Sequence, residues 1–250
     1  MKVDKENNNC LYNDEAHVYW NKQTERKYIS VTTLIGKYKK PFKDDSGKGF
    51  LWSEYKAIQK YVGDIVFEEL KAAVGFEKVV HEWKKQCSIE ELEDLPILAK
   101  MIRDDWEKTK YDACERGSQY HLAKENYWLS KAKHIIPELS KAELKTDTKY
   151  DLTIQDGIYP EFLVYNDEHN IAGQIDLLIK TGNEFTIIDY KTNKELKKKS
   201  YYNPKKKKSD KMLYPANKLD DCNFNHYQLQ LNMYAWMIEQ LDPKYEVTRL

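Results

Sequence analysis

The 250-residue chain has no excess of charge, few cysteines and no long apolar run. Lysine plus arginine and aspartate plus glutamate both number 41, so the formal net charge is zero. Only a local concentration of charge can therefore indicate a polyanionic partner. A membrane span needs about eighteen or more consecutive apolar residues, and secretion needs a charged and then apolar leader. Neither pattern is present, which argues against membrane spans and against secretion.

Cysteine is scarce and scattered, with no Cys-x-x-Cys pair. The four cysteines are Cys10, Cys87, Cys114 and Cys222. This spacing forms no metal knuckle, and reduced cytosolic thiols are the simplest interpretation. With 41% hydrophobic and 33% charged residues, the composition indicates one sizeable globular domain, or a core with a helical attachment.

Two apolar segments, residues 171–180 and 184–191, predict a β-hairpin. Both are rich in β-branched residues, and a Thr-Gly-Asn sequence separates them. If Gly182-Asn183 forms a two-residue turn, Thr181 pairs with Glu184. A shift of one residue would move every side chain of one strand to the opposite face, so this register is a specific prediction.

The register brings two carboxylates and an amine to one face of the sheet. Asp176 lies opposite Asp189, and Lys191 follows two residues later on the same face. Both aspartates adjoin apolar runs, where a charge is costly unless it is paired or bound to a metal. With Glu161 in the preceding strand, these groups suit Mg²⁺ or Mn²⁺ binding and phosphodiester hydrolysis. The alternative is that the aspartates are solvent-facing strand ends and Lys191 extends into water.

Motifs in a fixed order around this hairpin resemble the PD-(D/E)XK nuclease superfamily, in its RecB-like and phage-exonuclease branch. They are Ser30-Val-Thr, Gly117-Ser-Gln-Tyr-His121, Glu161, Gly173-x-x-Asp176, Asp189-Tyr-Lys191-Thr and Gln230-Leu-Asn-Met-Tyr234. The proline of the family name is not matched before Asp176, where Ile175 stands. The resemblance covers residues 28–250 and implies an α/β, restriction-endonuclease-like core with a central mixed β-sheet flanked by helices.

The resemblance also implies roles for individual residues. Metal ligands would be Asp176, Asp189, Glu161, His121 and the backbone carbonyl of Tyr190. Lys191 would position the attacking water or stabilise the transition state. Gln230 and Tyr234, one helical turn apart, would brace the catalytic loop or donate to a DNA phosphate; the alternative is a core tyrosine with a polar tip. Glu125, one turn after His121, would orient the imidazole.

Some relatives in this branch carry an iron–sulfur cluster on one cysteine before the nuclease motifs and three after them. Only Cys222 lies near the end of the motifs here, and it precedes Gln230. We therefore expect no iron–sulfur cluster, and Mg²⁺ or Mn²⁺ as the cofactor.

A lysine-rich stretch follows the catalytic strand. Residues 191–211 contain ten lysines against two acids. The lysines predicted to bind DNA are Lys194, Lys197, Lys198, Lys199, Lys205 and Lys206, with Tyr201, Tyr202 and Tyr214 available to stack bases. A solvated loop and a nuclear-import signal remain alternatives.

The remaining pattern predicts an N-terminal helical approach region, residues 1–97, and a nuclease core, residues 98–250. In the first region we expect frayed residues 1–9, a hairpin turning at Asn21-Lys22 and a helix capped by Ser30. Helices follow within residues 50–88, with a break near Gly75, and a capped turn at Ser88 leads to Pro96.

In the core we expect one or two long helices over residues 98–131, a strand pair at 148–154 and 158–164, and a helix over 225–241. A last strand over residues 245–250 would make the chain stop inside a strand, which suggests a truncated segment.

Together these features predict a divalent-metal-dependent DNA nuclease. By resemblance it would be an exonuclease acting on single strands or duplex ends in DNA processing. It would then act in the cytoplasm of a bacterium or of a phage-infected host cell. The alternative is a nuclease-fold module that binds DNA within a larger complex and cuts weakly or not at all. RNA cleavage also stays open.

Overall fold

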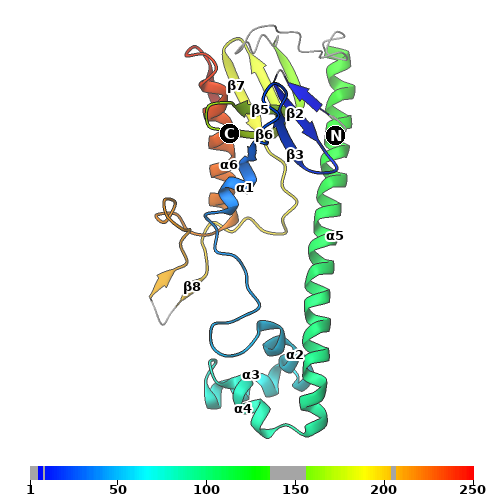
Figure 1. The fold of residues 1–250 in the computed structure, drawn as a ribbon, viewed down its shortest axis with the longest axis vertical. Helices are drawn as coiled ribbons and strands as arrows, with labels where there is room; N and C mark the ends of the chain where they lie inside the picture. The colour runs from blue at the N-terminus through cyan, green and yellow to red at the C-terminus, as the bar shows by residue number, and fades with distance from the viewer. Residues whose placement is uncertain (1–4, 8, 136–155, 204–206) are drawn as a thin grey trace. The chain divides into compact units, whose positions relative to one another are not determined.

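The computed structural model describes residues 5–7, 9–135, 156–203 and 207–250 (Figure 1). The chain divides into two compact units, Met1–Lys40 with Gly117–Leu250, and Pro41–Arg116. Residues 1–40 thus belong with the C-terminal part of the chain. In the described part, no helix has the length and hydropathy needed to cross a bilayer.

A mixed sheet forms the centre of the first unit. Its strands are β4 (Ile29–Ser30), β5 (Gly157–Asn166), β6 (Ile171–Thr181), β7 (Glu184–Ile188) and β10 (Glu246–Arg249). The order is β10-β7-β6-β4, and β5 also pairs with β6. Strands β5 and β7 run antiparallel to β6, whereas β4 pairs with β6 and β10 pairs with β7 in parallel. The predicted mixed α/β architecture is confirmed.

The hairpin of β6 and β7 has the predicted register. Thr181 pairs with Glu184, and Gly182 takes the left-handed backbone that a two-residue turn requires, with φ of 59°. The prediction that the second strand reaches residue 191 is wrong, because β7 ends at Ile188. Beyond that point the Tyr190 N–H donates to the side-chain carboxylate of Asp176 in β6, and not to a backbone carbonyl of that strand.

Strand β5 agrees with the strand predicted over residues 158–164. The strand predicted over residues 148–154 lies outside the described residues, and β5 pairs with β6. Glu161 interrupts this ladder between Phe162 and Pro160, and its backbone is left-handed, with φ of 53°. That conformation is strained for a non-glycine residue.

Helices α1 (Val31–Gly36) and α6 (Asn223–Glu239) pack together against the sheet (Figure 1). The predicted cap is confirmed, because the Ser30 hydroxyl accepts a hydrogen bond of 3.0 Å from the Thr33 N–H. Tyr234 of α6 is buried over Gly173 of β6, where any side chain beyond hydrogen would collide with the ring. The helix thereby approaches the sheet closely at the point where β6 carries the site.

A second, three-stranded sheet is made by β1 (Lys5–Asn7), β2 (Cys10–Asn13) and β3 (Val18–Asn21). The prediction of fraying is wrong for residues 5–7, since the buried Asn7 side chain donates 2.6 Å to the Leu163 carbonyl of β5. The chain reverses at the predicted position, where the Asn21 N–H donates 2.8 Å to the Arg26 carbonyl and Trp20 pairs antiparallel with Lys27. A second turn that was not predicted lies between β2 and β3, over residues 14–17. There the Asn13 side chain accepts the N–H of Ala16.

The second unit contains α2 (Trp52–Val62), α3 (Asp64–Val74), α4 (Val79–Gln86) and the first part of α5 (Ile89–Ile135). The break expected at Gly75 is confirmed, and a further break occurs at Gly63; both have positive φ. The core of this unit includes Ile58, Phe67, Val79, Trp83 and Leu95.

Helix α5 begins earlier than predicted. Ser88 does cap it, through a reciprocal pair of hydrogen bonds with Glu91, but the helix continues through Pro96. Leu95 and Ala99 on either side of the proline are buried in the core of the second unit. Tertiary packing therefore outweighs the local preference of proline to end a helix. The short strands β8 (Tyr202–Asn203) and β9 (Lys208–Ser209) form a hairpin in the lysine-rich stretch.

Candidate metal and nuclease site

Three residues from three separate elements converge on one point of the first unit. His121 of α5, Glu161 of β5 and Asp176 of β6 each offer a ligand atom, and these atoms all lie within 4.8 Å of one another. A nitrogen and two carboxylate oxygens form a donor set that Mg²⁺ or Mn²⁺ can use. The side chains present therefore fit a divalent ion.

Asp176 is the buried member of this group. Its neighbours in β6, Ile175 and Leu177, are fully buried, and Asp176 itself is 8% exposed. One carboxylate oxygen, Oδ2, accepts a 2.5 Å hydrogen bond from the Tyr190 N–H. The other, Oδ1, lies 3.3 Å from His121 Nδ1. Both oxygens thus have defined directions, and a charge inside an apolar strand has the partners it needs.

Glu161 is held in place from two sides. Gln174 of β6 donates a hydrogen bond to its Oε2 atom. Lys5 Nζ of β1 lies 3.6 Å from the same oxygen and 3.3 Å from Glu125 Oε1. Oε1 of Glu161 lies 3.8 Å from His121 Nδ1. The strained backbone at Glu161 and these contacts together direct the carboxylate toward the imidazole.

The carboxylates change the protonation of His121. Hydrogen bonds from the ring to Asp176 and then to Glu161 raise the pKa of His121 to about 10, against the opposing effect of burial. Without a metal ion, the imidazolium neutralises part of the acidic group at neutral pH. Glu125, which we expected to orient this ring, contacts Lys5 instead.

Asp189 and Lys191 form a second cluster beside the first. Asp189 Oδ2 lies 2.5 Å from Lys191 Nζ, and Oδ1 accepts a 3.0 Å hydrogen bond from the Gln230 side chain. Burial raises the pKa of Asp189, Lys191 opposes this shift, and the negative charge of Asp176 adds to it. Asp189 is therefore close enough to Asp176 for the two charges to interact. The oxygens of Asp189 are nevertheless not among the ligand atoms grouped at His121, Glu161 and Asp176.

Gln230 and Tyr234 lie behind Asp189. Gln230 is 7% exposed and Tyr234 is 2% exposed, and the Gln230 amide nitrogen also lies 3.1 Å from the Tyr234 hydroxyl. These contacts fit a bracing role for the two side chains. A direct contact with DNA remains a prediction from the resemblance.

Tyr190 links the catalytic segment to α5. Its hydroxyl accepts a 2.7 Å hydrogen bond from Trp128 Nε1, and its ring contacts His121 edge-on at 6.3 Å between centroids. The N–H of Tyr190 binds Asp176, as described above. A metal contact through its carbonyl remains a prediction.

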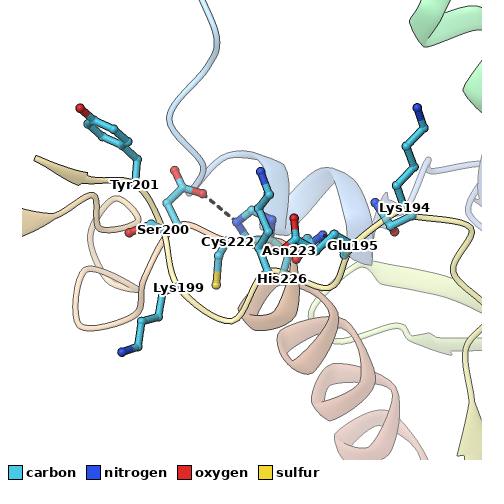
Figure 2. A pocket seen from close by; sticks show the side chains of 11 residues that line it. Lys194, Glu195, Lys199, Ser200, Tyr201, Cys222, Asn223 and His226 are labelled. Carbon is cyan, nitrogen blue, oxygen red and sulfur yellow. Dashed lines mark hydrogen bonds and ion pairs between the residues drawn. The ribbon is translucent and has the colours of Figure 1, made fainter.

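The lysine-rich stretch borders a separate cavity of about 530 Å³, formed where residues 193–201 pass the first turn of α6 (Figure 2). Its lining includes Lys194, Lys197, Lys199, Tyr201 and His226. His226 Nε2 lies 2.7 Å from Asp221 Oδ1.

Three of the lysines predicted to bind DNA therefore line one cavity. A fourth, Lys198, lies over the Phe224 ring at 5.7 Å from its centroid. Lys205 and Lys206 lie outside the described residues.

Lys5, Gln174 and Trp128 contribute to the site and were not identified from the sequence. Lys5 lies in a polar N-terminal stretch whose pattern contains no sign of a contact with Glu161. Gln174 is separated from Asp176 by one residue, so alternation along the strand could have suggested that it accompanies the aspartate. Gly173 belongs to the Gly173-x-x-Asp176 motif, but its role as a site of close backbone approach was not predicted, although glycine weakens a strand interior.

The chain was compared with known proteins. The model of the PD-(D/E)XK nuclease superfamily matches residues 55–249, which include His121, Glu161, Asp176, Asp189 and Lys191. No curated protein and no solved structure matched the chain. The mixed sheet flanked by helices is consistent with a restriction-endonuclease-like fold, and nucleases of this family use divalent metals. Since the match covers most of its length, the chain belongs to the PD-(D/E)XK nuclease superfamily.

Proposed function

We propose that this protein is a Mg²⁺- or Mn²⁺-dependent deoxyribonuclease that acts as an exonuclease in DNA processing. The observation that carries the proposal is the convergence of His121, Glu161 and Asp176 beside the ion pair of Asp189 and Lys191. The preference for exonuclease action, in a phage or bacterial setting, is supported by the order of the sequence motifs.

His121, Glu161 and Asp176 would hold the metal, with Asp189 completing or tuning the site. A divalent ion bound there supplies a Lewis acid for the scissile phosphodiester and a more acidic water. The Tyr190 N–H and the Gln174 amide keep the two inner carboxylates pointed at the imidazole. This preorganisation avoids rearrangement of charged groups during the reaction.

Lys191 supplies the positive charge of the site. Its ammonium is held by Asp189, which Gln230 fixes from behind, and it also lies over the Tyr227 ring at 5.0 Å from the centroid. A cation positioned in this way orients the attacking water or meets the charge that develops on the phosphate. Asp189 and Gln230 thus act on the reaction partly by positioning Lys191.

The lysines of residues 194–199 favour a polyanionic substrate. Their ammonium groups neutralise phosphates and release counterions, which makes binding dependent on salt. Residues 194–199 directly follow Lys191 in the chain. A DNA strand bound by these lysines would therefore lie close to the metal site.

The test is cleavage of end-labelled single-stranded, duplex and circular DNA with Mg²⁺, with Mn²⁺ and with EDTA. Asp176→Asn and Lys191→Met should lose cleavage of linear DNA while their circular dichroism spectra stay unchanged. Matched controls are Asp105→Asn and Lys108→Met, at exposed positions of the second unit, which should cut like the unaltered protein.

Three results would contradict parts of this proposal. Undiminished metal-dependent cleavage by the Lys191 variant would contradict the assigned site. Rapid cleavage of circular DNA would replace exonuclease by endonuclease action. DNA binding by the unaltered protein without any products would favour the alternative of a nuclease-fold binding module.

A further inference from the structure

One face of α5 carries an alternating row of tyrosines and lysines. Tyr120, Lys124, Tyr127 and Lys131 follow one another at spacings of four, three and four residues. Residues three and four apart lie on the same side of a helix. The four side chains therefore form one continuous row, which we name the α5 stripe.

Both aromatic rings of the α5 stripe are at the surface. Tyr120 is 40% exposed and Tyr127 is 50% exposed. Lys124 Nζ lies 5.3 Å from the centroid of the Tyr120 ring, and Lys131 Nζ lies 5.8 Å from that of Tyr127. Each exposed ring is thus accompanied by an ammonium group on a flexible stem.

The α5 stripe begins at the proposed catalytic site. His121 and Trp128, in the adjoining row of the same helix, contact Asp176 and the Tyr190 hydroxyl. Tyr120 contacts the Tyr190 ring edge-on at 6.0 Å between centroids, and Lys124 Nζ lies 5.6 Å from that ring. The stripe therefore leads from the segment that contains Asp189 and Lys191 toward the C-terminal end of α5.

A purely structural role explains this pattern less well. Pairs of tyrosine and lysine on an exposed helix face stabilise a helix only modestly. Stabilisation of this kind does not require two exposed rings to lie in one row that begins at the catalytic segment. Aromatic side chains that alternate with cations are what an unpaired nucleic-acid strand needs, because bases stack on rings and phosphates bind cations.

We propose that the α5 stripe binds the single-stranded part of a DNA substrate as it enters or leaves the cleavage site. Bases stack on Tyr120 and Tyr127, while Lys124 and Lys131 swing from the rings to the phosphates. This rests on the proposed function, whose substrate it specifies further. Duplex DNA gains little from the two rings, since its bases are already stacked on one another.

The spacing of the rings defines how many nucleotides they span. Seven residues separate Tyr120 from Tyr127, which corresponds to about 10 Å along a helix axis. At about 3.4 Å per stacked nucleotide, this distance accommodates about three nucleotides. The two tyrosines should therefore contact bases about three positions apart.

The first experiment measures binding of fluorescent oligo-dT and of a blunt duplex in EDTA, where no cleavage occurs. Tyr120→Leu and Tyr127→Leu should each weaken binding of oligo-dT about tenfold, as expected for the loss of one stacked base, and should change duplex binding less. Tyr120→Phe and Tyr127→Phe keep the ring and should restore binding. The control is Tyr111→Leu on the same helix, where the side chain is 68% exposed.

The lysines are tested by the salt dependence of the same binding. Lys124→Gln and Lys131→Gln should each reduce the slope of log affinity against log salt by about 0.7, the value for one phosphate contact of a single strand. Lys108→Gln, at an exposed position of α5 outside the stripe, should leave the slope unchanged.

Photo-crosslinking identifies which nucleotide lies beside each tyrosine, and this position does not depend on the stability of the helix. With 5-iodouracil placed at successive positions, the strongest crosslinks to Tyr120 and Tyr127 should fall about three nucleotides apart. Unchanged affinity of both leucine variants for oligo-dT, or an equal loss for the duplex, would overturn the proposal. Absence of any single-strand binding by the unaltered protein would do so too.

These outcomes are separate from those of the nuclease proposal. Binding through the stripe without cleavage in Mg²⁺ or Mn²⁺ would support the stripe and contradict nuclease action. Metal-dependent cleavage with no effect of the stripe variants would support nuclease action and contradict the role of the stripe.

Discussion

Asp189 and the lysines that follow it are neighbours in the sequence but differ in burial and in their contacts. The Asp189 side chain is 3% exposed and has two partners, Lys191 and Gln230. The four lysines from Lys194 to Lys199 are all exposed. Within ten residues, the chain changes from a buried charge with fixed partners to a series of exposed charges.

This difference reflects two physical requirements. A reacting group must be held close to one geometry, because a small displacement costs much of the rate. Attraction of a polyanion requires only local positive charge, and that attraction is shared among several side chains. Substitutions in the fixed cluster should therefore have large and individual effects, whereas substitutions among the lysines should have small and cumulative ones.

The largest effect is expected from Asp189→Asn. The amide keeps the shape of the side chain but removes the charge that holds Lys191, so cleavage should fall by about a thousandfold. The measurement is the initial rate on end-labelled DNA under saturating Mg²⁺. Lys197→Gln in the exposed stretch should change the same rate far less. Similar losses in both variants would remove the contrast between the buried, fixed charge and the exposed charges.

Gly173→Ala tests how closely α6 must approach the site. A Cβ atom at residue 173 would lie 2.5 Å from Cε1 of Tyr234, whose hydroxyl contacts Gln230. Overpacking of this kind costs about 1–3 kcal/mol, so the free energy of unfolding in urea should fall by that amount. Gly36→Ala is the control, because nothing lies within 4 Å of its Cβ position. Equal stability of the two variants would contradict the close packing.

The lysine-rich stretch should show a smaller, graded response. Replacing Lys194, Lys197 and Lys199 together by glutamine should weaken DNA binding at low salt and reduce the salt slope for duplex DNA by up to about 3. Each single replacement should give about a third of that change. A complete loss of binding from one replacement would instead indicate a specific contact. It would assign that contact to the cavity beside α6, which these three lysines line.

The last expected effect is a dependence of the stability of the metal-free protein on pH. Contacts with Asp176 and Glu161 raise the pKa of His121 to about 10, above its ordinary value of 6.5. The stabilisation is fully present below pH 6.5 and is lost as pH rises through about 10.

The measurement for this effect is urea unfolding in EDTA from pH 6 to 10. The free energy of unfolding should decline over this range, and the decline should be smaller in His121→Gln. The same decline in both proteins would assign it to other groups.

Local features of the fold could be predicted from the sequence. The register of β6 and β7 follows from a two-residue turn and the β-branched segments on either side. The Ser30 cap and the break at Gly75 follow from residue types that are specific for those positions. The early end of β7 and the passage of α5 through Pro96 could not be predicted, because both depend on contacts with distant segments.

The candidate site divides in the same way. Glu161, Asp176, Asp189, Lys191 and His121 could be identified, since a charge beside an apolar run and an ordered set of motifs are visible in the chain. The contacts of Lys5 with Glu161 and of Trp128 with Tyr190 could not, because their residues are far apart in sequence and have no local pattern.

By itself, the sequence determined the register of β6 and β7, the start of α1 and which charged groups must be compensated, because these depend on neighbouring residues and on the cost of burying charge. Only the tertiary structure decided which partners compensate them. Asn7 and Leu163, 156 residues apart, tie β1 to β5 and thereby bring Lys5 to Glu161. Such contacts depend on the packing of whole elements, and no local pattern records that packing.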